Sequence, residues 1–179
     1  MTRLTIFLFL LGGGALVSTM VPMGTRGRAG FPPQGRAGVD DSLAIVVNRS
    51  NPVESLSFSE LRKIFLENQD HWSNGRRITV VMLEPGKVER QVVLAQIYQM
   101  DEKDFNKYFL HGMLTGEVHV APKAMTNSTE VLKFVFNVPG AIGYVKASDV
   151  NDSVKVVRID SRLPGEKDYS IRLHAKPIK

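Results

Sequence analysis

The feature that most constrains the fold of this chain is a strand-like apolar run that a turn connects to a short amphipathic helix. Residues Leu43 to Val47 read LAIVV, a continuous β-branched and aliphatic stretch that is typical of a strand covered on both faces. The Asn51-Pro52 pair ends this run, because the residue before a proline avoids helical backbone angles. Ser57 and Glu60 then form a capping box, which predicts a helix from there to about Asn68.

The same alternation of strand and helix continues further along the chain. Residues 78 to 83 (ITVVML) predict a second buried strand. Pro85-Gly86 opens a helix that we expect to run to about Gln99. Apolar residues at helical spacing are expected to form the buried face of that helix; they are Val88, Val92, Ala95 and Tyr98.

The second half of the domain supplies two more helices and two more strands. Asp101 is expected to cap a helix through Phe109, and Asn127 with Glu130 forms a second capping box. Residues 141–145 and 154–159 are the last clear strands, and residues 169–173 are compatible with an edge strand. Alternating strands and helices predict an α/β fold, with a mixed sheet flanked by helices.

The first 39 residues differ in composition from the rest of the chain. Arg3 precedes an uncharged, mostly apolar stretch from Leu4 to Val21, which is typical of a signal peptide and also approaches the length of a membrane anchor. We therefore interpret residues 1–23 as a signal peptide or an N-terminal anchor, and residues 24–39 as a Gly/Pro/Arg-rich linker. Residues 40–179 form the folded domain. The predicted location is periplasmic or secreted, or else anchored to the membrane by the N-terminal segment alone.

Charge and cysteine content exclude several functions. The formal net charge is +5, but residues 1–38 hold four arginines and no acidic residue. The remaining residues are nearly balanced, which argues against a nucleic-acid partner. The chain has no cysteine, so disulfides, thiolate metal sites and a cysteine nucleophile are excluded.

No motif for catalysis or cofactor binding is present in the sequence. There is no Gly-x-Ser-x-Gly elbow, no phosphate-binding P-loop and no dinucleotide fingerprint. The histidines are not paired with carboxylates at helical spacing. We therefore expect no enzyme activity, no catalytic residues, no metal and no cofactor.

The chemistry that remains lies at helix amino termini, where free N–H groups and the helix dipole attract anions. Two segments qualify. One is the turn at residues 84–90, which contains Gly86, Lys87 and Arg90; the other is residues 126–129, with Asn127, Ser128 and Thr129. Each cap could equally serve only its own helix.

Several motifs occur in an order that resembles a known family. They are VVN-x-x-NP ending at Pro52, SFSELRKIF at 57–65, the Trp72-Ser-Asn-Gly turn, ITVV at 78–81 and PGAIGYV at 139–145. This ordered set resembles the phosphate-type (PstS-like) substrate-binding proteins of ABC transporters. The resemblance implies a type II periplasmic-binding-protein fold, in which α/β lobes hold an oxyanion between helix amino termini and the ligand passes to an ABC permease.

The resemblance covers roughly residues 42–160, so the chain looks like a short form with the first lobe largely missing. Where the family pattern after the ITVV-like strand is Ser-Gly-Thr-Arg, this chain has Lys87-Val88-Glu89-Arg90. The candidate ligand-binding set is Asn48, Gly86, Lys87, Arg90, Asn127, Ser128 and Thr129. The expected function is solute binding, with weak affinity for phosphate or another oxyanion. The alternative is a non-transport interaction or sensory module of the cell envelope on the same fold.

Overall fold

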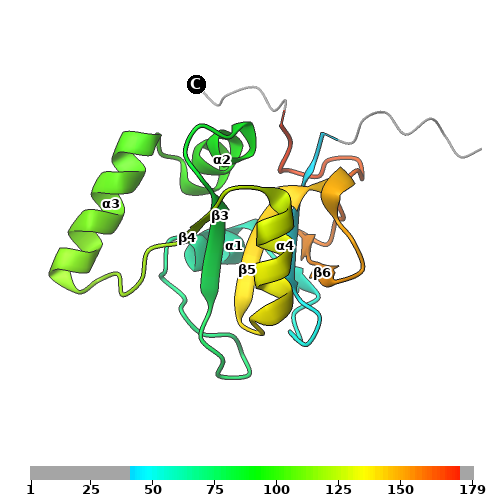
Figure 1. Ribbon diagram of the computed structural model, residues 1–179, viewed down its shortest axis with the longest axis horizontal. Coiled ribbons are helices and arrows are strands. Elements are labelled where there is room, and N and C mark those ends of the chain that lie inside the picture. Colours follow the sequence, from blue (N-terminus) through cyan, green and yellow to red (C-terminus); the bar gives the residue numbers. More distant parts are fainter. Residues whose placement is uncertain (1–40, 174–179) are drawn as a thin grey trace, which may run out of the picture. The chain divides into compact units, whose positions relative to one another are not determined.

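A five-stranded sheet lies at the centre of the part of the chain that the computed structural model describes, residues 41–173 (Figure 1). The order across the sheet is β4-β3-β5-β1-β6. Strand β3 runs parallel to both β4 and β5, whereas β1 is antiparallel to both β5 and β6. The mixed sheet confirms the predicted α/β class. The strands are β1 (Leu43–Asn48), β3 (Thr79–Leu83), β4 (Lys123–Met125), β5 (Ala141–Lys146) and β6 (Val154–Val156).

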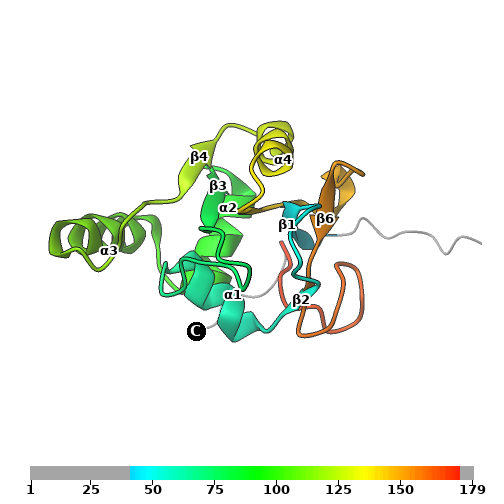
Figure 2. The ribbon, with the colours of Figure 1, turned by 90° about the horizontal axis from the view of Figure 1, so that it is seen from below.

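Helices cover both faces of this sheet. In the view of Figure 2, α4 (Ser128–Asn137) lies above the sheet and α1 (Phe58–Phe65) lies below it. Helix α2 (Val88–Val93) continues directly into a π-helical turn, η1 (Leu94–Tyr98), which packs against α1. Helix α3 (Glu102–Thr115) lies beyond the β4 side of the sheet in both views (Figures 1 and 2). A short 3-10 turn, η2 (Ala147–Asp149), follows β5.

Side-chain caps start three of the helices where the sequence predicted. Ser57 and Glu60 form the expected capping box at α1, and the Asp101 carboxylate accepts a hydrogen bond from the Asp104 amide at α3. At α4 the Asn127 side chain accepts from the Glu130 amide as expected. The return bond differs from the predicted box, because the Glu130 carboxylate accepts from the amide of Thr126 instead of Asn127. This bond fixes the residue before the cap.

The buried face of the second helix was only partly predicted, with Tyr98 buried as expected. Val88 and Ala95, expected inside, are exposed, and Val92 is only partly buried. Val88 is the first residue of the helix and lies at its exposed amino end. The π-helical turn from Leu94 to Tyr98 then changes the regular helical spacing around Ala95. The residues that it buries are Arg90, Val93, Leu94, Ile97 and Tyr98.

The strands near the ends of the domain also differ from prediction. The expected strand at 154–159 is split at Val157 into β6 and β7 (Arg158–Ile159). Strand β7 pairs with β2 (Ser55–Leu56), which was not predicted, in a second, two-stranded sheet. Residues 169–173 form no strand, although Leu43 donates a backbone hydrogen bond to the Ile171 carbonyl and Leu173 to that of Asp41. These two bonds form an isolated antiparallel bridge between Ser42 and Arg172, so the segment pairs with the start of β1 over a single residue pair instead of a full edge strand. The predicted leader and linker lie outside the described residues.

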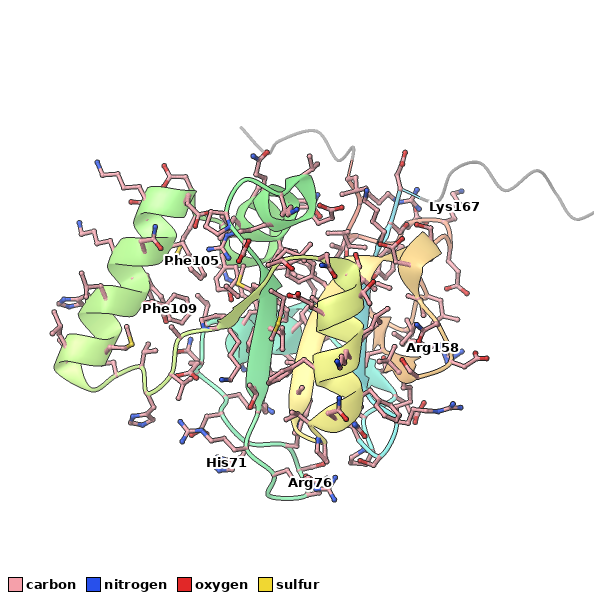
Figure 3. All side chains as sticks on the ribbon, viewed as in Figure 1. His71, Arg76, Phe105, Phe109, Arg158 and Lys167 are labelled. Atoms are coloured by element: carbon pink, nitrogen blue, oxygen red, sulfur yellow. The ribbon has the colours of Figure 1, made fainter. Side chains whose placement is uncertain are left out.

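An aromatic cluster attaches α3 to the rest of the core. The ring of Tyr98 lies 5.0 Å from that of Phe105 and 6.2 Å from that of Phe109, in edge-to-face arrangements. Such pairs are favoured by the ring quadrupoles. Figure 3 shows Phe105 and Phe109 on the side of α3 that faces the sheet. Helix α3 is thus held by one face, which leaves the opposite face in solvent.

Candidate functional site

The carboxyl ends of β3 and β4 bring the two predicted anion-binding turns to the same edge of the sheet. The two strands are parallel, with Leu83 level with Met125. Beyond their ends the backbone amide of Glu84 still donates to the Met125 carbonyl, at 2.9 Å. The chain then enters α2 from one strand and α4 from the other. Ligands of open α/β sheets typically bind at such a carboxyl edge.

The turn into α2 is open to solvent. Gly86 has φ +91°, a conformation that residues with a Cβ seldom adopt. Lys87 is the N-cap residue, is exposed, and makes no side-chain capping bond. Gly86 borders a small hollow of about 330 Å³ that includes Gln91, Leu94 and Glu102. The groups that this turn presents to a ligand are the exposed ammonium of Lys87 and backbone amides.

Arg90, the strongest anion-binding candidate by charge, is fully engaged inside the protein. Its side chain is buried and forms a two-pronged ion pair with Glu102, with Nε–Oε2 and Nη2–Oε1 distances of 2.9 and 2.7 Å. Its Nη1 donates to the Leu83 carbonyl at 2.8 Å, and the guanidinium stacks over the Phe105 ring. Arg90 therefore joins the end of β3 to the start of α3, and its charge is neutralised before a ligand could use it.

The neighbouring acid is also paired. Glu89 forms an ion pair with Lys146 at the end of β5, with an Oε1–Nζ distance of 3.0 Å. The Glu89 carboxylate raises the pKa of the Lys146 ammonium, so this cation stays protonated across the physiological range. These two ion pairs fix the first turn of α2 against β5 and α3.

The turn into α4 borders a larger surface groove of about 630 Å³. Asn127 uses its Oδ1 for the helix cap and its Nδ2 to donate to the Thr126 hydroxyl. The amides of Ser128 and Thr129 precede the capped Glu130 amide and have no acceptor among the described residues. The groove is lined by Asn127, Ser128, Thr129, Leu132, Lys133, Phe136, Asp149, Asn151 and Ser153.

The groove combines anion-attracting and anion-repelling groups. The helix dipole, the two amides and Lys133 attract an anion, whereas Asp149 repels it. The Glu130 carboxylate lies in the first turn as well; hydrogen bonds from the Thr126 backbone and side chain lower its pKa, so it is ionised at neutral pH. The electrostatics of this groove therefore allow weak anion binding at most.

Asn48 lies at the opposite edge of the sheet. It ends β1, which is antiparallel to β5, and so sits level with the beginnings of β3 and β5. Its Nδ2 donates to the carbonyls of Val135 and Phe136 at 2.9 and 2.6 Å, and its Oδ1 accepts from the amide and hydroxyl of Ser50. Asn48 thus binds the carboxyl-terminal end of α4.

The structure brings together only part of the candidate set. Asn127, Ser128 and Thr129 share one groove, whereas Gly86 borders a different hollow beside α2. Lys87 is exposed at the start of α2 and lines neither of them. Lys133 and the residues of the loop after β5 were missed by sequence reasoning. Lys133 could have been found, because it lies one helical turn after Thr129; no local signal marks Asp149, Asn151 or Ser153.

The described residues contain neither of two other kinds of site. Among residues 41–173, no three acidic or histidine side chains come close enough together to hold a metal ion. No helix in that same stretch has the length and apolar character needed to cross a membrane.

The chain has clear structural neighbours but no match at the level of sequence. It matches neither a protein-family model nor a curated protein. An ABC-type phosphate transport receptor from Vibrio cholerae aligns with a TM-score of 0.56 and 22% identity, over 69% of this chain and 48% of the receptor. A phosphate ABC transporter substrate-binding protein from Clostridium perfringens, solved with bound phosphate, aligns with a TM-score of 0.57 and 23% identity, over 69% and 47%.

The fold is that of phosphate-receptor proteins. PstS from Borrelia burgdorferi is a third example, with a TM-score of 0.53 and 14% identity. The predicted periplasmic-binding-protein-like architecture is therefore confirmed. The chain spans about half of the length of each of these receptors.

Proposed function

We propose that this chain is an exported solute-binding-like protein that binds phosphate or another small oxyanion weakly at the amino terminus of α4. The observation that carries the proposal is the placement of Asn127, Ser128 and Thr129. They line the larger groove at the carboxyl edge of the parallel strands, in a fold shared with phosphate receptors. Export rests on Arg3 and the apolar stretch from Leu4 to Val21.

The magnitudes support weak binding. A helix amino terminus contributes about 0.3–1 kcal/mol to an exposed anion, and each hydrogen bond to a charged group contributes about 1.5–3 kcal/mol. Two amides and the dipole thus provide a gross gain of about 3–7 kcal/mol. The costs of association reduce this gain, so the net affinity is expected to be millimolar or weaker. Lys133 adds to this sum and Asp149 opposes it.

The decisive experiment is a phosphate titration of the ¹⁵N-labelled full-length chain, followed by NMR in a non-ionic detergent. We expect the amide resonances of Ser128 and Thr129 to move with phosphate and to stay still with chloride at equal ionic strength. Lys133→Ala should reduce these shifts, whereas Lys87→Ala, at the other turn, should leave them unchanged. If no amide responds at about 20 mM phosphate, oxyanion binding is wrong for this chain.

The same pair of variants separates the two turns of the candidate set. Shifts centred on Gly86 and Lys87, lost in Lys87→Ala and retained in Lys133→Ala, would move the site to the turn into α2. Arg90 is unsuitable for this purpose, because its removal also breaks the link between α2 and α3.

A second candidate function is an interaction module of the cell envelope. The observation that favours it is the distribution of exposed apolar side chains. Leu110, Met113 and Leu114 are exposed on α3, with Val120 in the segment that follows. Apolar patches of this kind mark protein–protein contacts more often than scattered single residues do. Recovery of a partner by cross-linking in whole cells would support this function; a chain that binds phosphate and forms no cross-link would contradict it.

A further inference from the structure

The loop that leads into β3 carries the single Asn-Gly pair of the sequence, Asn74-Gly75. Both residues are exposed, and Figure 3 shows His71 and Arg76, which flank the pair, in the loop below β3. Gly75 has φ +78°, and among the described residues no atom outside its chain neighbours lies within 4 Å of the position that a Cβ would occupy. Gly75 therefore lacks the steric cover that a Cβ gives to other peptides.

The carboxamide of Asn74 is folded back along the peptides that follow it. Its Oδ1 accepts a hydrogen bond from the Arg76 amide at 3.1 Å, which forms an Asx turn. This bond polarises the carbonyl, so Cγ is more open to attack by a nucleophile. The Gly75 amide donates to the Trp72 carbonyl at 2.9 Å, and its nitrogen becomes available when this surface turn opens. Exposed turns open at a small free-energy cost.

We propose that Asn74 is a site of spontaneous deamidation. The Gly75 nitrogen gives up its proton to a base in the solvent and forms a bond to Cγ of Asn74, which closes a succinimide ring. The bond between Cγ and Nδ2 breaks, and Nδ2 takes up a proton and leaves as ammonia. Water then opens the ring. Cleavage between the nitrogen and Cγ gives aspartate, whereas cleavage between the nitrogen and the main-chain carbonyl carbon gives isoaspartate.

The surroundings of the other asparagines explain why this position is singled out. Each of them precedes a residue that has a Cβ, and Asn51 precedes a proline, which has no N–H. A Cβ on the following residue hinders the approach of its nitrogen to Cγ. Asn48 and Asn127 also hold their carboxamides in structural hydrogen bonds. Asn74 alone therefore combines an exposed carboxamide with a following glycine.

The two products differ in their effect on the fold. Backbone hydrogen bonds join Gly75 to Trp72 and Trp72 to Arg76, both at 2.9 Å, so the pair lies inside a closed turn. Isoaspartate inserts an extra methylene into the main chain of that turn, whereas aspartate keeps its spacing. The turn also positions the buried Trp72 ring, whose Nε1 donates to the Gly140 carbonyl at 3.0 Å. Isoaspartate should therefore loosen the packing of Trp72 before β5, and aspartate should not.

Ageing of the purified full-length chain in mildly alkaline buffer tests the proposal. Trypsin releases residues 64–76 as one peptide, and tandem mass spectrometry locates the mass increase of a carboxamide that has become a carboxylate. An unaged sample digested in parallel gives the baseline. We expect the increase at Asn74, with Asn68 of the same peptide unchanged. Conversion should be slower in mildly acidic buffer, because the Gly75 nitrogen must lose a proton.

The matched control is Asn74→Gln, whose longer side chain has to close a larger ring and should stay unconverted over the same period. Failure of Asn74 to convert in the folded chain would overturn the proposal. Conversion of the same chain unfolded in urea would then show that the turn protects Asn74. Equal conversion of Asn68 and Asn74 would also overturn it, since a general loss of carboxamides needs no special site.

A second measurement tests the effect on the fold. The aged wild type should unfold at a lower urea concentration than fresh Asn74→Asp, which carries the new charge without the extra methylene. Equal midpoints after Asn74 has converted would refute the loosening of Trp72. The site lies at the end of β3 opposite the groove of α4, so neither result depends on whether the chain binds an oxyanion.

Discussion

Asn48 illustrates at the scale of a single residue how a candidate ligand-binding side chain can be a structural one. Its four hydrogen bonds all remain within the protein, and Val135 and Phe136 receive two of them at the end of α4. The sequence indicates only that an asparagine stands at the end of a strand. The backbone atoms that it satisfies lie 87 and 88 positions away in the chain.

The stability effect of Asn48 follows from these contacts. Asn48→Ala should lower the free energy of unfolding by about 2–3 kcal/mol, because the carbonyl of Val135 loses a buried donor. Urea denaturation measures this change, with the exposed Asn106→Ala on α3 as a control expected within about 0.5 kcal/mol. A cost for Asn48→Ala as small as that of the control would mean that water replaces these bonds.

Arg90 is a second candidate residue that has a structural role. The exposure of its ion-pair partner, Glu102, determines how much stability is lost when Arg90 is replaced. Its side chain is 6% exposed and that of Glu102 is 37% exposed, so removal of the arginine leaves an acid that water can still reach. Arg90→Met should therefore destabilise the protein by about 2–3 kcal/mol, less than the loss of a fully buried pair. Arg90→Lys should recover only part of this stability, because an ammonium cannot form the two parallel bonds.

Urea denaturation of both variants measures these changes. The phosphate response at Ser128 and Thr129 should persist in Arg90→Lys, since this residue lies outside the groove of α4. Loss of that response in a folded Arg90→Lys variant would show that Arg90 contributes to phosphate binding.

The elements themselves were largely predictable where the signal is local. Apolar runs identified β1, β3 and β5, and the caps at Ser57, Asp101 and Asn127 identified three helix starts. Strands β2 and β4 were not predictable, because they are two or three residues long and contain exposed residues such as Lys123. Their conformation comes from pairing with β7 and β3, which sequence patterns do not reveal.

The prediction of the inward face of α2 failed in part for a related reason. Its phase depends on the π-helical turn η1 and on the contact of Arg90 with Glu102 in the next helix. Periodicity assumes a regular helix and apolar interior positions. Neither assumption holds in this segment.

The carboxylate caps make the helix starts sensitive to acid. Hydrogen bonds from the Ser57 hydroxyl and amide lower the pKa of Glu60, and bonds from Thr126 lower that of Glu130, both below the usual 4.5. A carboxylate with a lowered folded pKa adds stability above its unfolded pKa, and this stability is lost as the pH falls through the folded value. The caps of α1 and α4 should therefore weaken below about pH 4.5.

The measurement is the midpoint of urea unfolding at pH 6 and at pH 3. We expect the wild type to lose more stability between these values than the Glu60→Gln/Glu130→Gln variant does, since glutamine does not titrate. Equal losses in both proteins would show that the two caps do not contribute to acid sensitivity.

At the scale of the whole described unit, the sheet topology determines what the candidate site can be. Parallel pairing of β3 with β4 places both helix starts at one edge, which follows from the order of strands and helices. The second wall of the groove comes from Asp149, Asn151 and Ser153. The chain reaches that position only after β5 has crossed the sheet, so no local pattern could place these residues beside α4.

The shallow, solvent-open form of this surface groove also determines the kinetics of binding. An anion at Ser128 and Thr129 keeps most of its hydration, in contrast to ligands that are enclosed by a deep pocket. The phosphate titration should therefore show fast exchange on the NMR timescale, with a Kd of about 1 mM or weaker. Raising the ionic strength from about 0.01 to 0.15 M shortens the Debye length from about 30 to 8 Å, so affinity should fall several-fold. Slow exchange with micromolar affinity that resists salt would require a closed site, which the groove beside α4 does not provide.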